Sequence, residues 1–238
     1  MHIEVLPDAA AAGERAARRI AECAEGGLRE RGRFLLALSG GHTPQPMYEA
    51  LARLPLAWRR VALFQADERA VPPASEARNW SHVARLLLAP LGASGPQTHP
   101  MPAMAAHELD AAAAEYAQTL VAAAGAPPQL DLVHLGLGSD GHTASLFAGD
   151  AALEVDDAWV AATGVQQGHR RLTLTLPALA RARRSLWLVC GADKAAALAR
   201  LLAGERGLPA ARLPRRTAWV VADAAACPGR APGVEEIE

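Results

Sequence analysis

Short apolar runs alternate along this chain with longer segments whose apolar residues recur at helical spacing. We expect strands at the apolar runs, which cover residues 34–38, 61–64, 130–137, 185–190 and 217–221. Strands are also expected at 159–162 and at 172–176, where leucine alternates with threonine. We expect helices at 8–31, which is rich in alanine, glutamate and arginine, at the alanine-rich segment 105–124, and at 80–91 and 193–203. Strands that alternate with helices predict an α/β fold with a mostly parallel sheet covered by helices on both faces.

Glycine and proline mark the expected ends of several elements. Gly32 follows the segment 8–31 and is expected to end that helix. Thr43-Pro44 indicates an N-cap followed by proline at the first helical position. Stretches near 92–102 and 204–214 contain proline and glycine and are predicted to be surface loops. The sequence shows no internal repeat, linker or clear domain boundary, so we expect residues 1–238 to form a single domain.

The composition narrows the functional class. Of the 238 residues, 51% are hydrophobic, which suffices for one sizeable core, and 24 basic residues nearly balance 25 acidic ones. No basic block suggests nucleic acid, and no apolar run reaches the roughly 18–20 residues that cross a bilayer. The amino terminus lacks the pattern of a signal peptide, and the three cysteines are widely separated. We therefore expect a cytoplasmic protein with free thiols and without nucleic-acid or membrane partners.

The most informative stretch is the apolar run 132–137 and the glycine-rich turn that follows it. The turn carries Asp140 and His142, and a short helix is expected to begin directly after it. Open α/β sheets bind their ligands at the carboxyl ends of the strands. Histidine is the side chain best suited to move protons near neutral pH, so His142 is the candidate general base.

Two other strand ends carry polar residues. Ser39-Gly40-Gly41-His42-Thr43 lies between a strand and a helix, where glycine amides can approach a phosphate; the alternative is an ordinary turn. In Asp67-Glu68-Arg69, strand alternation would send Asp67 and Arg69 to one side. Arginine can bind a phosphate or carbonyl oxygen, whereas the alternative is a solvated loop with a local salt bridge.

Several other chemistries find little support in the sequence. The pattern Gly136-x-Gly138-x-x-Gly141 matches the dinucleotide fingerprint, but Gly149 follows too soon for a crossover helix. No histidine or cysteine spacing is typical of a metal site, and no G-x-S-x-G elbow marks a serine nucleophile. We expect no metal and no cofactor. His134 is expected to be a core histidine whose ring is hydrogen-bonded, and His42 has no assigned role.

Taken together and in order, these motifs resemble those of bacterial 6-phosphogluconolactonases, within the glucosamine-6-phosphate isomerase/6-phosphogluconolactonase family. The resemblance rests on residues 39–44, 67–69 with Asn79, 138–147, 171–177 and the late 213–219. It implies a single Rossmann-like domain and a metal-independent carboxylic ester hydrolase of the pentose phosphate pathway. The implied substrate is a small phosphorylated sugar lactone, 6-phospho-D-glucono-1,5-lactone, which is converted to 6-phosphogluconate.

The same resemblance assigns roles to individual residues. It implies His142, Arg69 and Asp67 as catalytic residues. It also implies a set of residues that bind the substrate or its phosphate: Ser39, Gly40, Gly41, Thr43, Asn79, Asp140, Gly141 and Arg171. In the implied reaction, His142 takes a proton from water and returns it to the leaving ring oxygen. Arg69 or backbone N–H groups stabilise the oxyanion.

The chain departs from the family pattern at three places. Ala77-Arg78 precedes Asn79 where the family often has Asp-Ser, and Ala148 stands where proline is frequent. Residues 166–168, Gln-Gln-Gly, replace a Lys-Pro pair that usually lies before the arginine. The lost lysine predicts that an arginine takes its place at the phosphate, with Arg171 as the leading candidate; Arg170, Arg78 or His169 are the reserves.

Two rival functions remain at this stage. An aminosugar-phosphate deaminase/isomerase would be expected to continue the turn as I-A-F-N-E-P, but residues 143–148 here are Thr-Ala-Ser-Leu-Phe-Ala. A non-enzymatic sugar-phosphate sensor domain would be expected beside a helix-turn-helix, and the sequence shows none ahead of the α/β region. The sequence leaves the choice between monomer and homodimer open.

Overall fold

The computed structural model describes residues 1–102, 108–230 and 232–236. Its main sheet has eight strands in the order β11-β1-β10-β9-β6-β2-β3-β5. In chain order these strands span His2–Leu6 (β1), Phe34–Leu38 (β2), Val61–Gln65 (β3), Gln97–His99 (β5), Leu132–Leu135 (β6), Arg184–Val189 (β9), Ala218–Asp223 (β10) and Gly233–Glu236 (β11). Every neighbouring pair is parallel except β1 with β11. The predicted mostly parallel sheet is therefore confirmed.

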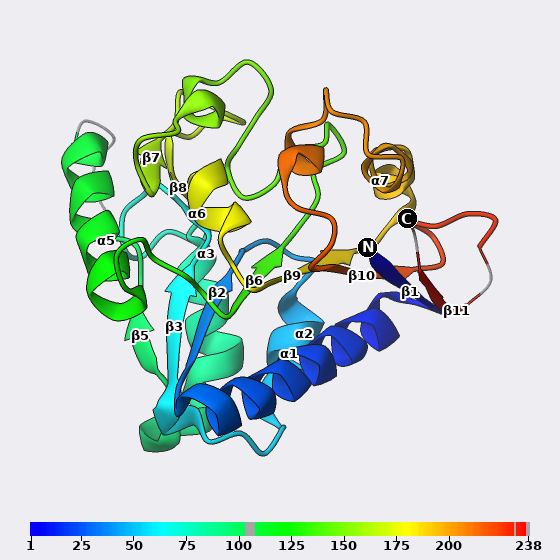
Figure 1. Ribbon diagram of the computed structural model, residues 1–238, viewed down its shortest axis with the longest axis horizontal. Coiled ribbons are helices and arrows are strands. Elements are labelled where there is room, and N and C mark those ends of the chain that lie inside the picture. The colour runs from blue at the N-terminus through cyan, green and yellow to red at the C-terminus, as the bar shows by residue number, and fades with distance from the viewer. Residues whose placement is uncertain (103–107, 231, 237–238) are drawn as a thin grey trace.

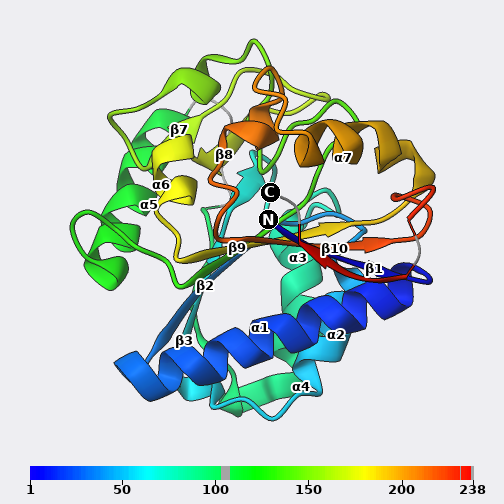
Figure 2. The same ribbon diagram turned by 45° about the vertical axis from the view of Figure 1, so that its right-hand side comes forward.

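Helices cover both faces of this sheet (Figures 1 and 2). One face carries α1 (Ala9–Arg31), α2 (Gln45–Ala52) and a helical stretch of α3 (Asn79–Val83), a π-turn (Ala84–Leu88) and α4 (Ala89–Leu91). The other face carries α5 (Leu109–Ala124), α6 (Leu176–Ala180) and α7 (Ala195–Leu202). Short 3₁₀ turns lie at Trp58–Arg60, Gly92–Ser94, Ala151–Glu154, Ala192–Lys194 and Pro209–Arg212.

The central strands are buried on both faces, which explains their uninterrupted apolar sequence. In β2, Leu35 and Ala37 join the core beneath α5 and α7, whereas Phe34, Leu36 and Leu38 join the core beneath α1 and α2. The two clusters are separated by the sheet because successive side chains of a strand point to opposite faces.

A second, three-stranded antiparallel sheet lies on the α5 side of the molecule (Figure 1). Its order is β4-β8-β7, with β4 at Asp67–Arg69, β8 at Arg171–Leu174 and β7 at Val160–Ala162. Its register sets Arg69 opposite Arg171 and Asp67 opposite Thr173. The small sheet thus brings two predicted functional segments together that lie a hundred residues apart in the chain.

The main sheet has a topological switch point between β2 and β6. From β2 the chain continues to β3 and β5 on one side, whereas from β6 it continues to β9 and β10 on the other. The loops that leave β2 and β6 therefore diverge at their carboxyl ends. Ligands of open α/β sheets bind in such crevices.

Most predicted elements are present, but two local predictions are wrong. Thr43 is not an N-cap: α2 begins at Gln45 after Pro44, and no side chain caps it. Pro46 occupies the first turn of the helix, where its missing N–H needs no partner.

The helix expected directly after His142 is absent as well. Residues 143–148 form an irregular segment in which Ala144 has φ +47°. The Thr143 hydroxyl donates to the Gly136 carbonyl at 2.9 Å, and Ser145 is bonded to Asp67 and Thr173. These side-chain bonds hold the backbone out of a helix.

The pattern of the sequence also left three strands unpredicted. β5 lies inside the stretch 92–102 that was expected to be a loop, and β1 and β11 lie near the termini. Because β1 pairs with β10, β10 is an interior strand of the main sheet. Residues 105–107 of the predicted helix 105–124 fall outside the described residues; the described part of that helix is α5.

Candidate active site

A cleft of about 260 Å³ opens at the switch point, at the carboxyl ends of β2, β3, β6 and β9. Nine residues predicted from the sequence line it: Ser39, Gly40, Gly41, Thr43, Asp67, Arg69, Asn79, His142 and Arg171. Asp140 and Gly141 do not line the cleft and lie in the turn that carries His142. The structure thus gathers the three predicted segments, and Arg171, around one cavity.

His142 is held from two directions. Its Nδ1 lies 2.5 Å from Asp140 Oδ1, and its ring stacks on Phe147 with centroids 4.1 Å apart. Burial opposes the Asp140 charge, but the hydrogen bonds from His142 outweigh it and lower the pKa of the Asp140 carboxyl. With Nδ1 donating to this carboxylate, a neutral ring presents the lone pair of Nε2 as its acceptor. This is the arrangement that a general base requires.

Two glycines make the turn before His142 compatible with this contact. A Cβ on Gly138 would lie 2.1 Å from His142 Nδ1, so any larger residue would displace the ring. Gly141 has φ +85°, and a Cβ there would lie 1.9 Å from Leu208 Cδ1. Gly141 is therefore a residue of the turn geometry, with the Gly141 carbonyl bonded to the amide of Ala210.

The turn after β2 packs tightly against α3. A Cβ on Gly40 would lie 2.1 Å from Asn79 Cγ, and Gly41 adopts φ +102° in open space. Tyr48 donates its hydroxyl to the Ser39 carbonyl. Both glycines thus bring the backbone close to the cleft, which is what a cradle for an anion needs.

Strand geometry persists through Asp67-Glu68-Arg69, so the alternation predicted for this triplet is confirmed. Asp67 and Arg69 line the cleft, and Glu68 points away from it. Asp67 Oδ2 accepts from the Ser145 hydroxyl at 2.7 Å. Arg69 Nη1 donates to the Ala77 carbonyl at 2.9 Å, which anchors the guanidinium at the cleft.

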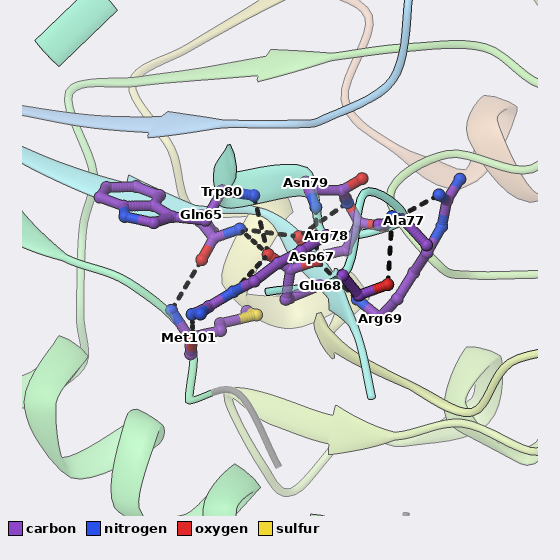
Figure 3. A network of polar contacts seen from close by, with 10 residues as sticks. Gln65, Asp67, Glu68, Arg69, Ala77, Arg78, Asn79, Trp80 and Met101 are labelled. Atoms are coloured by element: carbon purple, nitrogen blue, oxygen red, sulfur yellow. Dashed lines mark hydrogen bonds and ion pairs between the residues drawn. The ribbon is translucent and has the colours of Figure 1, made fainter. Parts of the chain in front are cut away.

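Glu68 organises the segment behind the cleft (Figure 3). Its buried carboxylate accepts from the backbone amides of Arg69, Asn79 and Trp80 at 2.8–2.9 Å, and from Gln65 Nε2 at 2.9 Å. Burial raises the pKa of this carboxyl, against the hydrogen bonds that lower it. The carboxylate caps the start of α3, whose own N-cap residue makes no side-chain bond, and so fixes Asn79 over Gly40. The alternative of a solvated loop at residues 67–69 is wrong.

Arg171 is a buried arginine, 4% exposed, at the edge of the cleft. Its Nη2 donates to Gln167 Oε1 at 3.2 Å and to the Gln166 carbonyl at 3.4 Å, and its guanidinium lies 5.5 Å from the Phe147 ring centroid. Among the described residues it forms no ion pair. Burial lowers its pKa, yet arginine keeps its charge at any physiological pH.

The two reserve arginines lie elsewhere. Arg78 is committed to Glu68, 3.6 Å away, and to the Met101 carbonyl at 3.0 Å (Figure 3). Arg170 Nε donates to the Thr163 carbonyl at 3.1 Å. Neither residue lines the cleft, nor does His169.

Sequence reasoning missed three polar residues that line the cleft: Lys194, Gln167 and His134. Lys194, the only lysine of the chain, lies in the turn after β9 and pairs with Asp193 at 3.1 Å. Its position after an apolar strand was the available signal, because that places it at the same edge of the sheet. Gln167 had no such signal, since it lies in the turn between β7 and β8, and His134 was expected only as a core residue.

The described residues contain neither a candidate metal centre nor a candidate membrane-spanning helix. No group of three or more histidine, cysteine, aspartate or glutamate side chains there is arranged to hold a metal ion. None of the helices in that part of the chain is long and apolar enough to cross a bilayer.

Known proteins share both sequence and fold with this chain. A family model described as "Glucosamine-6-phosphate isomerases/6-phosphogluconolactonase" matches residues 7–221. A 6-phosphogluconolactonase of Synechocystis is 42% identical over 181 residues, covering 75% of each chain. One of Nostoc is 37% identical, covering 84% of this chain and 85% of the relative.

Solved structures show the same likeness. A 6-phosphogluconolactonase of Thermotoga maritima superposes with a TM-score of 0.81 at 29% identity, covering 93% of this chain and 98% of that one. A monomeric glucosamine-6-phosphate deaminase has a TM-score of 0.78 at 19% identity, covering 95% and 98%. The second likeness shows a shared fold alone.

Proposed function

Because the chain belongs to the glucosamine-6-phosphate isomerase/6-phosphogluconolactonase family, we propose that it hydrolyses 6-phospho-D-glucono-1,5-lactone, with His142 as the general base. The enzyme class, a 6-phosphogluconolactonase, is supported by curated relatives of that name at up to 42% identity. The single observation that carries the catalytic assignment is the His142–Asp140 pair on a switch-point cleft that is also lined by Arg171, a buried arginine with no ion pair among the described residues. We also propose that the enzyme is cytoplasmic and acts in the oxidative pentose phosphate pathway.

The proposed reaction proceeds through a tetrahedral intermediate. His142 Nε2 takes a proton from water as the water oxygen bonds to the lactone carbonyl carbon. The carbonyl oxygen becomes an oxyanion, stabilised by Arg69 or by backbone amides of the glycine turns. The carbonyl then re-forms, the bond to the ring oxygen breaks, and His142 returns its proton to that oxygen. Asp67 keeps one carboxylate oxygen on Ser145 and offers the other to a substrate hydroxyl or the water.

The phosphate is proposed to bind away from the reacting carbon. Arg171 and Lys194 supply positive charge, and the amides at Gly40 and Gly41, with the Thr43 hydroxyl, supply donors. Binding energy from this remote group positions the ring against His142. Lys194 fills the role of the lysine that residues 166–168 lack, so the phosphate need not depend on arginine alone.

A specific observation disfavours the deaminase alternative. That reaction needs a carboxylate shortly after the histidine turn, and the first acid of this chain there is Asp150. Asp150 is 6% exposed, and its two oxygens accept from the amides of Ala152 and Gly164 and from Gln166 Nε2. A carboxylate bound in this way cannot assist the opening of a sugar ring in the cleft.

Parallel assays test the proposal on the purified protein. We expect hydrolysis of 6-phosphogluconolactone well above the spontaneous rate and no release of ammonia from glucosamine 6-phosphate. We also expect the activity to survive exhaustive chelation, because the proposed steps need only water and protein side chains. Deamination without lactone hydrolysis would overturn the proposal, and loss of activity on chelation, restored by a divalent ion, would overturn its metal-free mechanism.

A further inference from the structure

The hairpin turn between β7 and β8 holds a glutamine in an unfavourable backbone conformation. Gln167 has φ +50° and Gly168 has φ +83°, while the amides and carbonyls of Gln166 and His169 bond to each other. Two-residue turns with positive φ at both central positions favour asparagine, aspartate or glycine at the first of them. Glycine suits the second central position, Gly168, but the backbone conformation at the first does not favour the glutamine found there, Gln167.

The surroundings hold this turn in place. Asp150 Oδ2 accepts from the Gly164 amide at 3.0 Å and from Gln166 Nε2 at 2.9 Å. At the base of the hairpin, the Arg171 amide donates to Thr163 Oγ1 at 3.0 Å. Strained residues persist where neighbouring contacts over-determine them, and they are concentrated at functional sites.

The side chain of Gln167 reaches the cleft and contacts Arg171. Gln167 lines the cleft, and its Oε1 accepts from Arg171 Nη2 at 3.2 Å. Arg171 has no carboxylate partner among the residues described, so this amide oxygen is one of few groups that orient its guanidinium. A neutral acceptor fixes the guanidinium without cancelling the charge that an anionic ligand needs.

We propose that Gln167 is a positioning residue, which holds the Arg171 guanidinium toward the phosphate of the substrate and so sets the preference for phosphorylated over unphosphorylated lactone. This inference rests on the proposed function. It explains why a residue unsuited to the turn occupies position 167: asparagine suits the backbone but is one methylene shorter, and glycine has no side chain to reach Arg171.

The decisive variant is Gln167→Gly, which suits the backbone and removes the amide. We expect a higher melting temperature, because the strain is relieved. We also expect KM for 6-phosphogluconolactone to rise about tenfold with kcat nearly unchanged, as for the loss of one hydrogen bond to a charged group. Hydrolysis of glucono-1,5-lactone, which lacks the phosphate, should not change.

Two further variants sharpen the test. Gln167→Glu keeps the length of the side chain but pairs a carboxylate with Arg171, so KM for the phosphorylated lactone should rise further. Val165→Ser is the matched control, because Val165 is 68% exposed in the same loop and does not line the cleft; both of its kinetic constants should equal those of the wild type.

The inference is overturned if Gln167→Gly leaves KM unchanged, or if it lowers the melting temperature together with activity on both lactones. Calorimetric titration with 6-phosphogluconate separates this inference from the proposed function. Wild-type protein that binds this compound but does not hydrolyse the lactone refutes only the proposed function. An active wild type with unaltered Gln167→Gly kinetics refutes only the inference.

Discussion

At the scale of single residues, the buried charge of Arg171 indicates that the ligand of the site is an anion. A buried charge is costly unless something compensates it, and buried arginines are normally paired with an acid. Arg171 is 4% exposed and is bonded to neutral oxygens of Ser145, Gln166 and Gln167. Burial lowers the pKa of Arg171, and the nearby charge of Asp67 raises it. Because the two residues form no ion pair among the described residues, an anionic group in the cleft would be the direct partner of Arg171.

Replacing Arg171 should therefore impair the phosphorylated substrate selectively. We expect Arg171→Ala to raise KM for 6-phosphogluconolactone by about 10- to 100-fold, the effect of losing a hydrogen-bonded charge. KM for glucono-1,5-lactone should change little. Arg170→Ala is the neighbouring control and should keep wild-type kinetics, because Arg170 does not line the cleft. Equal losses on both lactones would show that Arg171 supports the fold and not the phosphate.

The residues of the site differ in how far the sequence could predict them. Asp67 and Arg69 lie in β4, so strand alternation sets the side to which each side chain points. His142 lies in the glycine turn that follows β6 after its end at Leu135, at the edge of the sheet where ligands of α/β folds bind. Lys194 lies at the same edge, in the turn that follows β9 after its end at Val189. Phe147 and Gln167 contact His142 and Arg171 across irregular backbone, which no local pattern encodes.

At the scale of elements, the site depends on two glycine-containing turns, each of which packs closely against a neighbouring element. The turn after β2 touches α3 through Gly40 and Asn79, and the turn after β6 touches β4 through Ser145 and Asp67. Residues of both turns line the cleft, so a displacement of either turn would change the shape of the site.

Gly40→Ala tests the first of these contacts. The added methyl group would lie 2.1 Å from Asn79 Cγ, so the turn or α3 must move. We expect a loss of about 1–3 kcal/mol in the free energy of unfolding, typical of overpacking, together with reduced kcat/KM. Gly26→Ala is the control: Gly26 lies in α1 with open space around its Cα, and alanine there should stabilise the protein by up to about 1 kcal/mol. Urea unfolding of both variants measures the difference.

The sequence predicted the elements that are long, apolar and buried, and two of the three strands that it missed are short and polar. The third, β1, is a buried interior strand in which Glu4 interrupts the apolar residues. β5 (Gln-Thr-His) and β11 (Gly-Val-Glu-Glu) are edge strands, and edge strands carry polar residues that hide the strand pattern. The helix expected after His142 failed for a different reason, since Thr143 and Ser145 bond to β4, β8 and the β6 end instead of to their own turn.

At the scale of the whole molecule, the fold places a titratable group in the middle of its sheet. His134, in β6, is 1% exposed, and burial lowers its pKa to about 3. The prediction that it lies in the core is confirmed. The expectation that its ring is hydrogen-bonded is wrong, because neither ring nitrogen has a partner among the described residues. Folding therefore requires the neutral ring, whereas the unfolded chain can protonate it at its ordinary pKa near 6.5.

This asymmetry predicts how stability depends on pH. Between pH 6.5 and about 3, the unfolded state binds a proton at His134 that the folded state does not, so acidification destabilises the protein. We expect wild type to lose about 1–3 kcal/mol more than His134→Leu in the free energy of unfolding between pH 7 and pH 4. At pH 7 the variant should be at least as stable, because leucine leaves no unpaired nitrogen. Parallel pH profiles for the two proteins would contradict the buried neutral state.

The global arrangement follows from the sequence more readily than its assembly does. Alternating strands and helices predicted the parallel sheet, its two covered faces and the edge at which the site lies. The single domain spanning 1–238 stays a prediction. The choice between monomer and homodimer also stays open, because the hydrophobic pattern shows which residues are buried but not whether their own chain or a second copy covers them.

The central claim is that His142 moves the proton in the hydrolysis of a phosphorylated lactone. The most direct test is the rate of 6-phosphogluconolactone hydrolysis by wild type and His142→Ala, each corrected for the spontaneous reaction. The account predicts a fall in kcat of about 10²- to 10⁴-fold for the variant, with an unchanged circular dichroism spectrum and retained affinity for 6-phosphogluconate. A folded His142→Ala protein that turns over the lactone at nearly the wild-type rate would contradict the claim.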